Sequence, residues 1–272
     1  MKTTNIANLK EGELVSSFLI CKRFNIKVSR LGDPFIDLLL EDSSGTIRAK
    51  IWSFVDQFMS KISINEAFAV KGKVISFNQS LEIDIHHISK VENKLYDKYG
   101  YKKELLIAKV DENTDDLYEN LLYYINEIDH KCKKNIKFFF KKNKKKIISI
   151  PSLDKKYNLS GGFLSQIISV LNLNKKLSNA YEYDYNLVKI AIIFKNIGLV
   201  DFFKEDFYKI DTEEMVKGYN LFSLDIYDKN FKNYDDIYLL LQNLILKNKF
   251  SNQLEIDIVK YFYKIDLLMT KQ

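Results

Sequence analysis

The sequence predicts a two-domain α+β protein in which a five-stranded β-barrel is followed by an all-α helical domain. Two observations carry this prediction. Between residues 9 and 91, apolar and polar residues alternate in short runs separated by turn-forming residues, whereas from residue 117 onward apolar residues recur at the three- to four-residue spacing of helices. A chain of 272 residues with 46% hydrophobic residues can form two small domains, each with its own core.

Five strands are expected in the first domain, at residues 15–26, 35–41, 46–52, 67–75 and 81–88. Arg48, Lys50 and Trp52 share one face of the third strand, and apolar residues occupy the other face. Residues 42–45 form a tight turn before this strand, and residues 53–60 form a short helix after it. Five strands with a helix between the third and the fourth are the order of the OB fold.

We expect the OB domain at residues 1–92, a helical connector with a basic run at residues 93–150, and a second helical domain at residues 151–272. Within the connector, residues 138–140 are three phenylalanines, which we expect in a core or a domain interface. Five lysines follow between residues 141 and 146. Two interpretations of this run are open: a solvated helix end, which the helix dipole favours, or an extension of a nucleic-acid-binding surface.

The formal net charge of +6 fits a polyanionic partner, and all three arginines lie in the first 50 residues. Basic side chains bind phosphates, and aromatic rings stack on bases at about 1–3 kcal/mol each. The residues expected to bind nucleic acid are Lys22, Arg23, Lys27, Arg30, Phe35, Arg48, Lys50, Trp52, Lys71, Lys73 and Phe77. The sequence therefore predicts a surface for single-stranded RNA or DNA. Two alternatives stay open: Trp52 closes the barrel core, and the lysines form only a solvated strand face.

Several classes of protein are disfavoured. No segment approaches the roughly 18 apolar residues of a membrane helix, and no secretory signal is present, so we expect a cytoplasmic protein without a membrane partner. Cys21 and Cys132 are far apart in sequence, and we expect two reduced, partly buried thiols. His86 is expected to reach ligand and His87 to pack inward, while His130 and Cys132 are expected to form a surface pair.

Short segments spread over most of the chain resemble the YhaM-type 3′–5′ exoribonucleases. Residues 9–12 (LKEG), 34–38 (PFIDL), 41–42 (ED) and 45–52 (GTIRAKIW) resemble the OB domain of that family. Residues 161–164 (GGFL) and 197–198 (IG) resemble its Gly-Gly-Leu-Leu turn and its His-Asp-Ile-Gly signature. The resemblance implies a C-terminal HD domain, in which histidines and aspartates hold one or two divalent metals that activate water against a phosphodiester.

The sequence departs from this family where the family binds metal. None of the three histidines lies after residue 130. Aligned on residues 161–162, the ligand positions fall on Lys156, Tyr157, Gln166, Lys195, Asn196, Tyr219, Lys260 and Tyr263. A lysine ammonium repels a metal that an imidazole would bind, and Lys195 would itself supply the charge of the metal. We therefore expect a degenerate HD-like domain with no catalytic residue, no metal and no cofactor.

Three functions follow from these patterns. The leading one is a non-catalytic protein that binds single-stranded nucleic acid, RNA in particular, and keeps the HD-like domain as a scaffold. The second is an active metal-dependent 3′–5′ exoribonuclease with variant carboxylate ligands. The third is an assembly protein, in which exposed aromatic residues such as Tyr181, Tyr183 and Tyr185 build a homo-oligomer or dock a partner.

Overall fold

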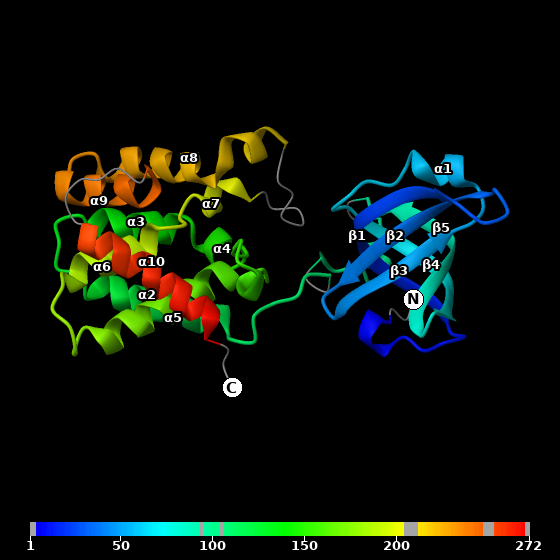
Figure 1. Ribbon diagram of the computed structural model, residues 1–272, viewed down its shortest axis with the longest axis horizontal. Helices are drawn as coiled ribbons and strands as arrows, with labels where there is room; N and C mark the ends of the chain where they lie inside the picture. Colours follow the sequence, from blue (N-terminus) through cyan, green and yellow to red (C-terminus); the bar gives the residue numbers. More distant parts are fainter. Residues whose placement is uncertain (1–3, 93–94, 104–105, 204–211, 247–252, 270–272) are drawn as a thin grey trace. The chain divides into compact units, whose positions relative to one another are not determined.

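The computed structural model describes residues 4–92, 95–103, 106–203, 212–246 and 253–269 (Figure 1). It divides into two compact units, Met1–Ala108 and Lys109–Gln272. The first is a closed β-barrel and the second is helical, so the predicted two-domain α+β fold class is confirmed. The division after Ala108 places the helices of residues 114–147, which we expected in a connector, in the second unit.

The barrel consists of β1 (Leu14–Val28), β2 (Pro34–Asp42), β3 (Gly45–Ile51), β4 (Ala67–Phe77) and β5 (Ser80–Lys90), closed in the order β1-β2-β3-β5-β4. Because β1 has 15 residues, its first half pairs with β4 and its second half with β2, with a bulge between Cys21 and Arg23. A parallel pairing of β3 with β5 completes the barrel. The short helix α1 (Val55–Met59) lies between β3 and β4, which confirms the OB order.

Alternation along the strands separates the two faces of the barrel. Ile36, Leu38 and Leu40 of β2 are buried inside it, as are Ala49 and Ile51 of β3. Burial of such an aliphatic side chain contributes about 1.5–3 kcal/mol, which fixes the register because a one-residue slip would expose all of them. The residues between them therefore point outward, where a ligand can reach them.

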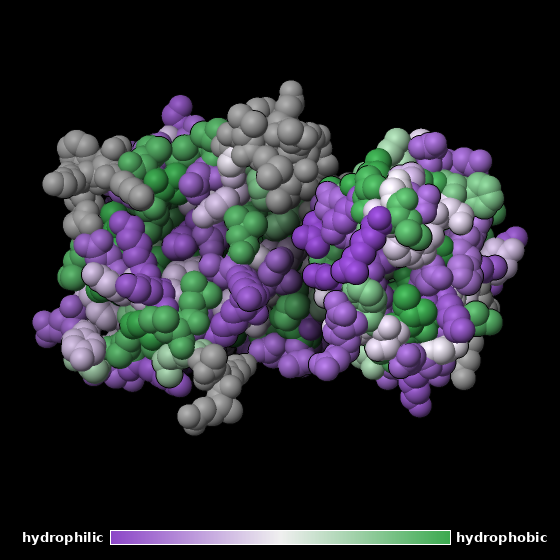
Figure 2. All heavy atoms as spheres, turned by 45° about the vertical axis from the view of Figure 1, so that its right-hand side comes forward, coloured by the Kyte–Doolittle hydropathy of each residue, from purple (hydrophilic) through white to green (hydrophobic). Residues whose placement is uncertain are grey.

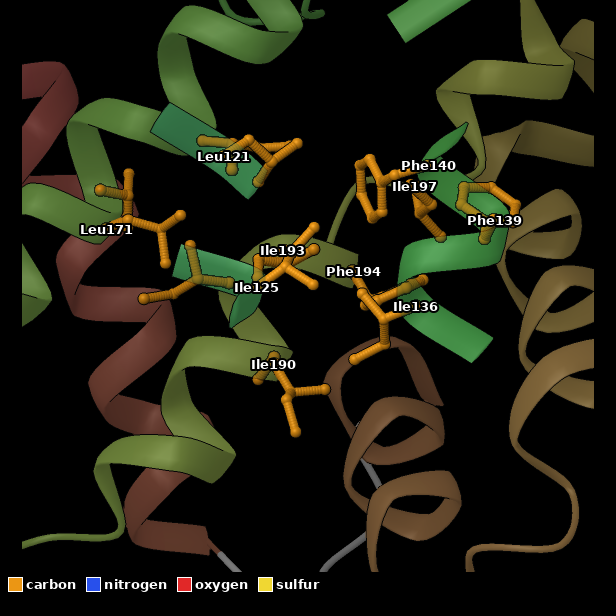
Figure 3. Close-up of a cluster of buried hydrophobic side chains, with 14 of the residues drawn as sticks. Leu121, Ile125, Ile136, Phe139, Phe140, Leu171, Ile190, Ile193, Phe194 and Ile197 are labelled. Carbon is orange, nitrogen blue, oxygen red and sulfur yellow. The ribbon is translucent and has the colours of Figure 1, made fainter. Parts of the chain in front are cut away.

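The second unit is built from helices and short helical turns. They are α2 (Thr114–Asn126), α3 (Lys133–Lys142), α4 (Lys144–Ile147), η4 (Lys155–Tyr157), α5 (Gly162–Leu177), α6 (Tyr185–Phe194), α7 (Leu199–Phe202), α8 (Thr212–Phe231), α9 (Asp235–Leu246) and α10 (Gln253–Leu268). Leu121 and Ile125 of α2, Phe140 of α3, and Ile193 and Phe194 of α6 are fully buried in one cluster (Figure 3). Among the described helices, none is both long and apolar enough to cross a membrane.

Two glycines are required by close backbone approach in this unit. A Cβ at Gly162 would lie 1.8 Å from the carbonyl oxygen of Tyr157, at the start of α5. A Cβ at Gly198 would lie 2.1 Å from the carbonyl oxygen of Tyr219 on α8, and the Gly198 N–H donates to Ser223 Oγ at 2.9 Å. These contacts give a packing reason for the glycine in each of the segments GGFL and IG.

The three phenylalanines of residues 138–140 divide between core and surface. Phe139 and Phe140 are buried, whereas Phe138 is 67% exposed. The lysine run that follows spans the end of α3 and the first three residues of α4, and Lys144 forms an ion pair with Asp115 at 3.0 Å. The sequence expectation of a core position therefore applies to two of the three rings.

The three tyrosines expected to be exposed differ from one another. Tyr181 is 68% exposed. The Tyr183 hydroxyl donates to Asn174 Oδ1 at 2.7 Å, and the Lys189 ammonium lies 4.3 Å from the centre of the Tyr185 ring. Tyr183 and Tyr185 are partly buried, so the expectation of exposure is wrong for both of them.

Both cysteines are free and buried. Burial raises the pKa of the Cys21 thiol to about 11 and that of Cys132 to about 12. His130 Nδ1 lies 2.9 Å from Cys132 Sγ, but the thiol is fully buried, so the expected surface pair is wrong for its cysteine member.

Candidate nucleic-acid interface

A stacked pair of aromatic rings lies on the outside of the barrel. The Trp52 indole, one residue after β3, stacks on the Phe35 ring of β2 with centroids 4.5 Å apart and planes inclined by 29°. Phe35 is 9% exposed and Trp52 is 45% exposed. The barrel core therefore does not contain Trp52, and the interpretation that this residue closes the core is wrong.

Lys50 connects this pair to a third ring. Its ammonium lies 4.2 Å from the centre of the Phe77 ring and 6.0 Å from that of Trp52. The same ammonium is 2.6 Å from the carboxylate of Glu82, which is almost fully buried. An ammonium within about 6 Å of a ring centre is attracted to the ring face, so Lys50 holds the two rings and the buried carboxylate together.

We call Phe35, Lys50, Trp52 and Phe77 the stacking surface. It is built by the start of β2, the end of β3 and the end of β4, next to the turn that joins β4 to β5. The exposed fractions of Trp52 and Phe77, 45% and 51%, leave ring area for a ligand. On the face of the barrel unit seen in Figure 2, hydrophilic and hydrophobic residues are interspersed.

Basic residues surround the stacking surface. Arg48 precedes Lys50 by two residues on the same face of β3, and it is opposite Leu39, which is in turn opposite Arg23. Arg30 lies in the loop between β1 and β2 and is exposed. Among the described residues, none of these three arginines forms an ion pair, so their guanidinium groups are available to phosphate.

The lysines near this face have acidic neighbours that the sequence interpretation missed. Lys22 lies 3.6 Å from Glu41, and Lys27 pairs with Asp37. Alternation alone places Lys50 on the outer side of β3 and Glu82 on the outer side of β5, but the pairing of β3 with β5 is needed to show that the two side chains meet. The charge of Lys22, Lys27 and Lys50 is therefore partly compensated by a neighbouring carboxylate.

Lys71 and Lys73 differ in their position relative to the stacking surface. Both are on β4, which borders β1 and β5 but not β3. Lys73 is opposite Asp84, which is in turn opposite Lys50 of β3, whereas Lys71 is opposite His87, outside the part of β5 that pairs with β3. The strand order, which the local sequence pattern does not contain, therefore separates Lys71 from the stacking surface and leaves Lys73 two strands from Lys50 on the same outer face.

A bulge in the pairing of β4 with β5 changes the expected directions of the two histidines in β5. Lys71 is opposite His87 while Gly72 is opposite Ile85, which leaves His86 as the extra residue. Both histidines are exposed, and His86 Nε2 lies 3.7 Å from Asp84. The expectation that the two histidines point to opposite faces is therefore wrong, whereas the His87 ring does pack edge-on against the Phe58 ring, with centroids 6.3 Å apart.

In the helical unit, most of the positions aligned with metal ligands meet around Asp154. Gln166 donates from Nε2 to Asp154 Oδ2 at 2.6 Å, and its Oε1 accepts from Ser152 Oγ at 2.6 Å. Lys195 donates to Asn196 Oδ1 at 3.3 Å, and its ammonium lies 4.1 Å from the centre of the Tyr263 ring. These residues form a polar cluster, defined as Asp154, Gln166, Lys195, Asn196, Tyr219 and Tyr263.

The charges in the polar cluster compensate one another. Burial lowers the pKa of Lys195, and attraction by the Asp154 carboxylate offsets part of that shift. Burial raises the pKa of Tyr219 and of Tyr263, and the negative charge of Asp154 raises both further. The cluster therefore contains one carboxylate and one ammonium among neutral hydroxyl and amide groups.

Two further aligned positions lie at a neighbouring carboxylate, and one lies apart. The Tyr157 hydroxyl is 3.1 Å from Asp266 Oδ1, and Lys156 donates to the Asp266 carbonyl oxygen at 2.6 Å. Lys260 instead lies 3.8 Å from Asp257 on its own helix. In the described part of the chain, histidine, cysteine, aspartate and glutamate nowhere form a group of three that could hold a metal ion.

The closed five-stranded barrel with an aromatic and basic outer face defines the class of the N-terminal unit as an OB-fold module. Residues 22–91 match the family model of the OB-fold nucleic acid binding domain. The N-terminal unit thus contains an OB-fold nucleic-acid-binding domain.

Solved structures similar to this chain include several OB-fold proteins. The second OB-fold domain of replication protein A from Methanococcus maripaludis is 20% identical, with 35% of this chain and 99% of that chain covered and a TM-score of 0.28. A replication protein A heterotrimer bound to single-stranded DNA is 18% identical, with 35% and 69% covered and a TM-score of 0.27. The SSB domain of a Synechococcus protein is 6% identical, with 30% and 97% covered and a TM-score of 0.26.

Proposed function

We propose that this protein binds single-stranded nucleic acid on the stacking surface of its barrel and does not cleave it. The observation that carries the proposal is the position of Lys50 between the rings of Trp52 and Phe77. Two exposed rings held by one cation offer stacking platforms to successive bases, and such stacking accepts every base. The expected ligand is therefore a strand with little sequence preference.

In this proposal, Lys50 positions the rings and the arginines bind the phosphates. The ammonium of Lys50 is engaged by Glu82 at 2.6 Å, so its charge is largely compensated. Arg48 on the same strand face and Arg23 across β2 carry exposed guanidinium groups without an acidic partner in the described part of the chain. A guanidinium offers a planar fork that matches phosphate oxygens and stacks on bases.

RNA is the preferred strand in this proposal, because the segments LKEG, PFIDL and GTIRAKIW resemble those of an exoribonuclease family. The same resemblance suggests that the helical unit is a degenerate HD-like domain. The residues of the polar cluster do not fit the metal that such a domain binds: an ammonium, two amides and two tyrosines accompany a single carboxylate. The helical unit then acts as a scaffold.

A time course with 5′-labelled single-stranded RNA and manganese tests both parts of the proposal. We expect the RNA to stay intact on a denaturing gel and to shift on a native gel, and the shift to weaken with salt. The double variant Trp52→Ala/Phe77→Ala should lose the shift. A ladder that shortens from the 3′ end and disappears with chelator would instead make the protein a nuclease, and intact RNA without a shift would overturn the binding role.

Homo-oligomer formation through the helical unit is a second candidate, and α10 provides the observation that favours it. Leu254, Tyr261, Ile265 and Leu268 recur at helical spacing and are 37–73% exposed. We infer that a second copy of this chain covers this stripe. Light scattering should give a dimer or larger species for the wild type and a monomer for Tyr261→Lys/Ile265→Lys, whereas a monomeric wild type would contradict this candidate.

A further inference from the structure

A pocket of about 370 Å³ lies on the barrel unit, apart from the stacking surface. It is formed between the outer face of β4 and β5 and the segment at residues 95–99. Lys71 at the pocket and Phe77 at the stacking surface are six residues apart on β4, about 20 Å at the rise of a strand. The two sites are therefore distinct.

Aromatic and apolar side chains form the walls of this pocket. Phe18 is almost fully buried, and its ring makes edge contacts with Tyr96 at 5.9 Å and with Tyr101 at 5.2 Å. Tyr99 is 44% exposed, and the ammonium of Lys98 lies 5.1 Å from the centre of its ring. Because these contacts hold the rings in place, the pocket offers a preformed apolar slot for a flat ring.

Two polar side chains lie together at the same pocket. Lys71 and His87 are directly opposite each other in the pairing of β4 with β5, and both are exposed. Lys71 has no carboxylate within ion-pair distance among the described residues, whereas Lys90 on the neighbouring strand pairs with Glu66 at 3.0 Å. An uncompensated ammonium beside an imidazole favours an anionic group on the ligand.

We propose that this pocket binds a single nucleotide, with the base in the aromatic slot and a phosphate at Lys71 and His87. The volume lies near the lower end of the range of about 300–1,000 Å³ for small-molecule pockets, which fits one nucleotide better than a longer segment. The nucleotide has two possible sources, a free mononucleotide or one nucleotide of a bound strand. This inference goes beyond the proposed function and does not depend on the stacking surface binding a strand.

The test is calorimetric titration of the full-length protein with AMP and with UMP at low salt. We expect saturable binding of at least one of them, and Lys71→Gln should weaken it at least about tenfold by removing the charged contact to phosphate. Lys73→Gln is the matched control, because Lys73 is an exposed lysine two residues along the same face of β4 but does not line the pocket. This control should bind as the wild type does.

A second variant and a second ligand separate the possible outcomes. Tyr96→Leu keeps an apolar wall but removes the aromatic ring. It should weaken the binding of the nucleotide as Lys71→Gln does. If the site serves a bound strand, Lys71→Gln should also weaken long oligouridylates while leaving tetranucleotides unaffected. Trp52→Ala should leave AMP and UMP binding unchanged. Loss of strand binding at the stacking surface can therefore be distinguished from loss of nucleotide binding at the pocket. No saturable binding of either nucleotide, together with no effect of Lys71→Gln on oligonucleotides of any length, would overturn the inference.

Discussion

The indole of Trp52 stacks on the ring of Phe35, with centroids 4.5 Å apart. The Phe35 ring is buried against the barrel, whereas the Trp52 indole is nearly half exposed. The packed Phe35 ring therefore fixes the orientation of the exposed indole. A ring that is already fixed loses little conformational entropy when a base stacks on it. This relationship makes the outer face of β2 and β3 suited to binding a flexible strand.

Removal of either exposed ring should weaken binding of a single strand. We expect Trp52→Ala and Phe77→Ala each to cost about 1–3 kcal/mol in the free energy of binding, because each removes one stacking partner. Fluorescence anisotropy with a labelled oligouridylate measures this loss. Phe54→Ala is the control, since Phe54 is an even more exposed ring (65%) of the barrel unit outside the stacking surface. Equal losses for all three variants would argue against a defined surface.

Arg48 should contribute through its charge. We expect Arg48→Gln to reduce the slope of log K against log salt by about 0.7, the value of one phosphate contact on a single strand. The same change at Lys264, an exposed lysine of the helical unit, should leave the slope unaltered. An unchanged slope for Arg48→Gln would remove this arginine from the set of phosphate-binding residues.

Lys50 should be important for stability as well as for binding. Lys50→Met leaves the carboxylate of Glu82 buried without its cation, and we expect the free energy of unfolding to fall by about 3 kcal/mol. Urea unfolding followed by Trp52 fluorescence reports on the barrel alone, because Trp52 is the only tryptophan. Lys90→Met, which breaks the more exposed pair with Glu66, should cost at most about 1 kcal/mol. Similar losses for both variants would contradict the role given to Lys50.

The charge of Lys195 should make the stability of the helical unit depend on pH. Burial lowers its pKa from the ordinary value near 10.5, so the unfolded chain holds a proton that the folded chain releases. The contribution of Lys195 to the free energy of unfolding is therefore lowest at pH values below its folded pKa. It rises as the pH increases from that pKa to the ordinary value near 10.5. Lys195→Met should remove this dependence, and it should not lower the free energy of unfolding at pH 7, because burial disfavours the charged form of this lysine more than Asp154 favours it. Thermal melts of both proteins by circular dichroism at pH 7.0 and 9.5 measure the difference.

A destabilised Lys195→Met protein at pH 7 would show instead that the ammonium contributes net stability through Asp154. Comparison of the variant with the wild type at each pH cancels the contributions of Lys189, whose pKa burial also lowers, and of the buried tyrosines. The difference between the two proteins thus isolates one group.

Both thiols should be unreactive in the folded protein. With pKa values of about 11 for Cys21 and about 12 for Cys132, almost no thiolate is present at pH 8, and burial excludes reagents. We expect labelling by a disulfide reagent to be slow in the native state and rapid in denaturant. Rapid native labelling of one thiol would locate a local opening of the barrel or of the helical unit.

The sequence predicts the strands of the barrel correctly because the alternation and the turns that define them are local features. Alternation in β2 and β3 and the turn between them decide which residues face the core, and the structure has the same faces. The bulge at His86 was not visible in this way, because it depends on how β5 pairs with β4 rather than on its own residues. The burial of Cys132, two residues from a partly exposed histidine, likewise depends on tertiary packing.

The candidate site could be predicted only in part. The outward directions of Arg48, Lys50 and Trp52 follow from the period of a strand, but their neighbours depend on strand order. Strand order brings the buried Glu82 to Lys50 and carries Lys71 away to a separate pocket. The alternation within one strand therefore does not predict which opposite charges meet on adjacent strands.

The most direct test of the central claim uses the only tryptophan as the reporter. Trp52 fluorescence is recorded while an oligouridylate is added to the full-length protein, and binding is followed in parallel by anisotropy of a label on the RNA. If bases stack on the surface formed by Trp52, Lys50 and Phe77, quenching should saturate together with the anisotropy and should weaken with salt. Binding that leaves Trp52 fluorescence unchanged would place the strand elsewhere on the protein and would contradict this account.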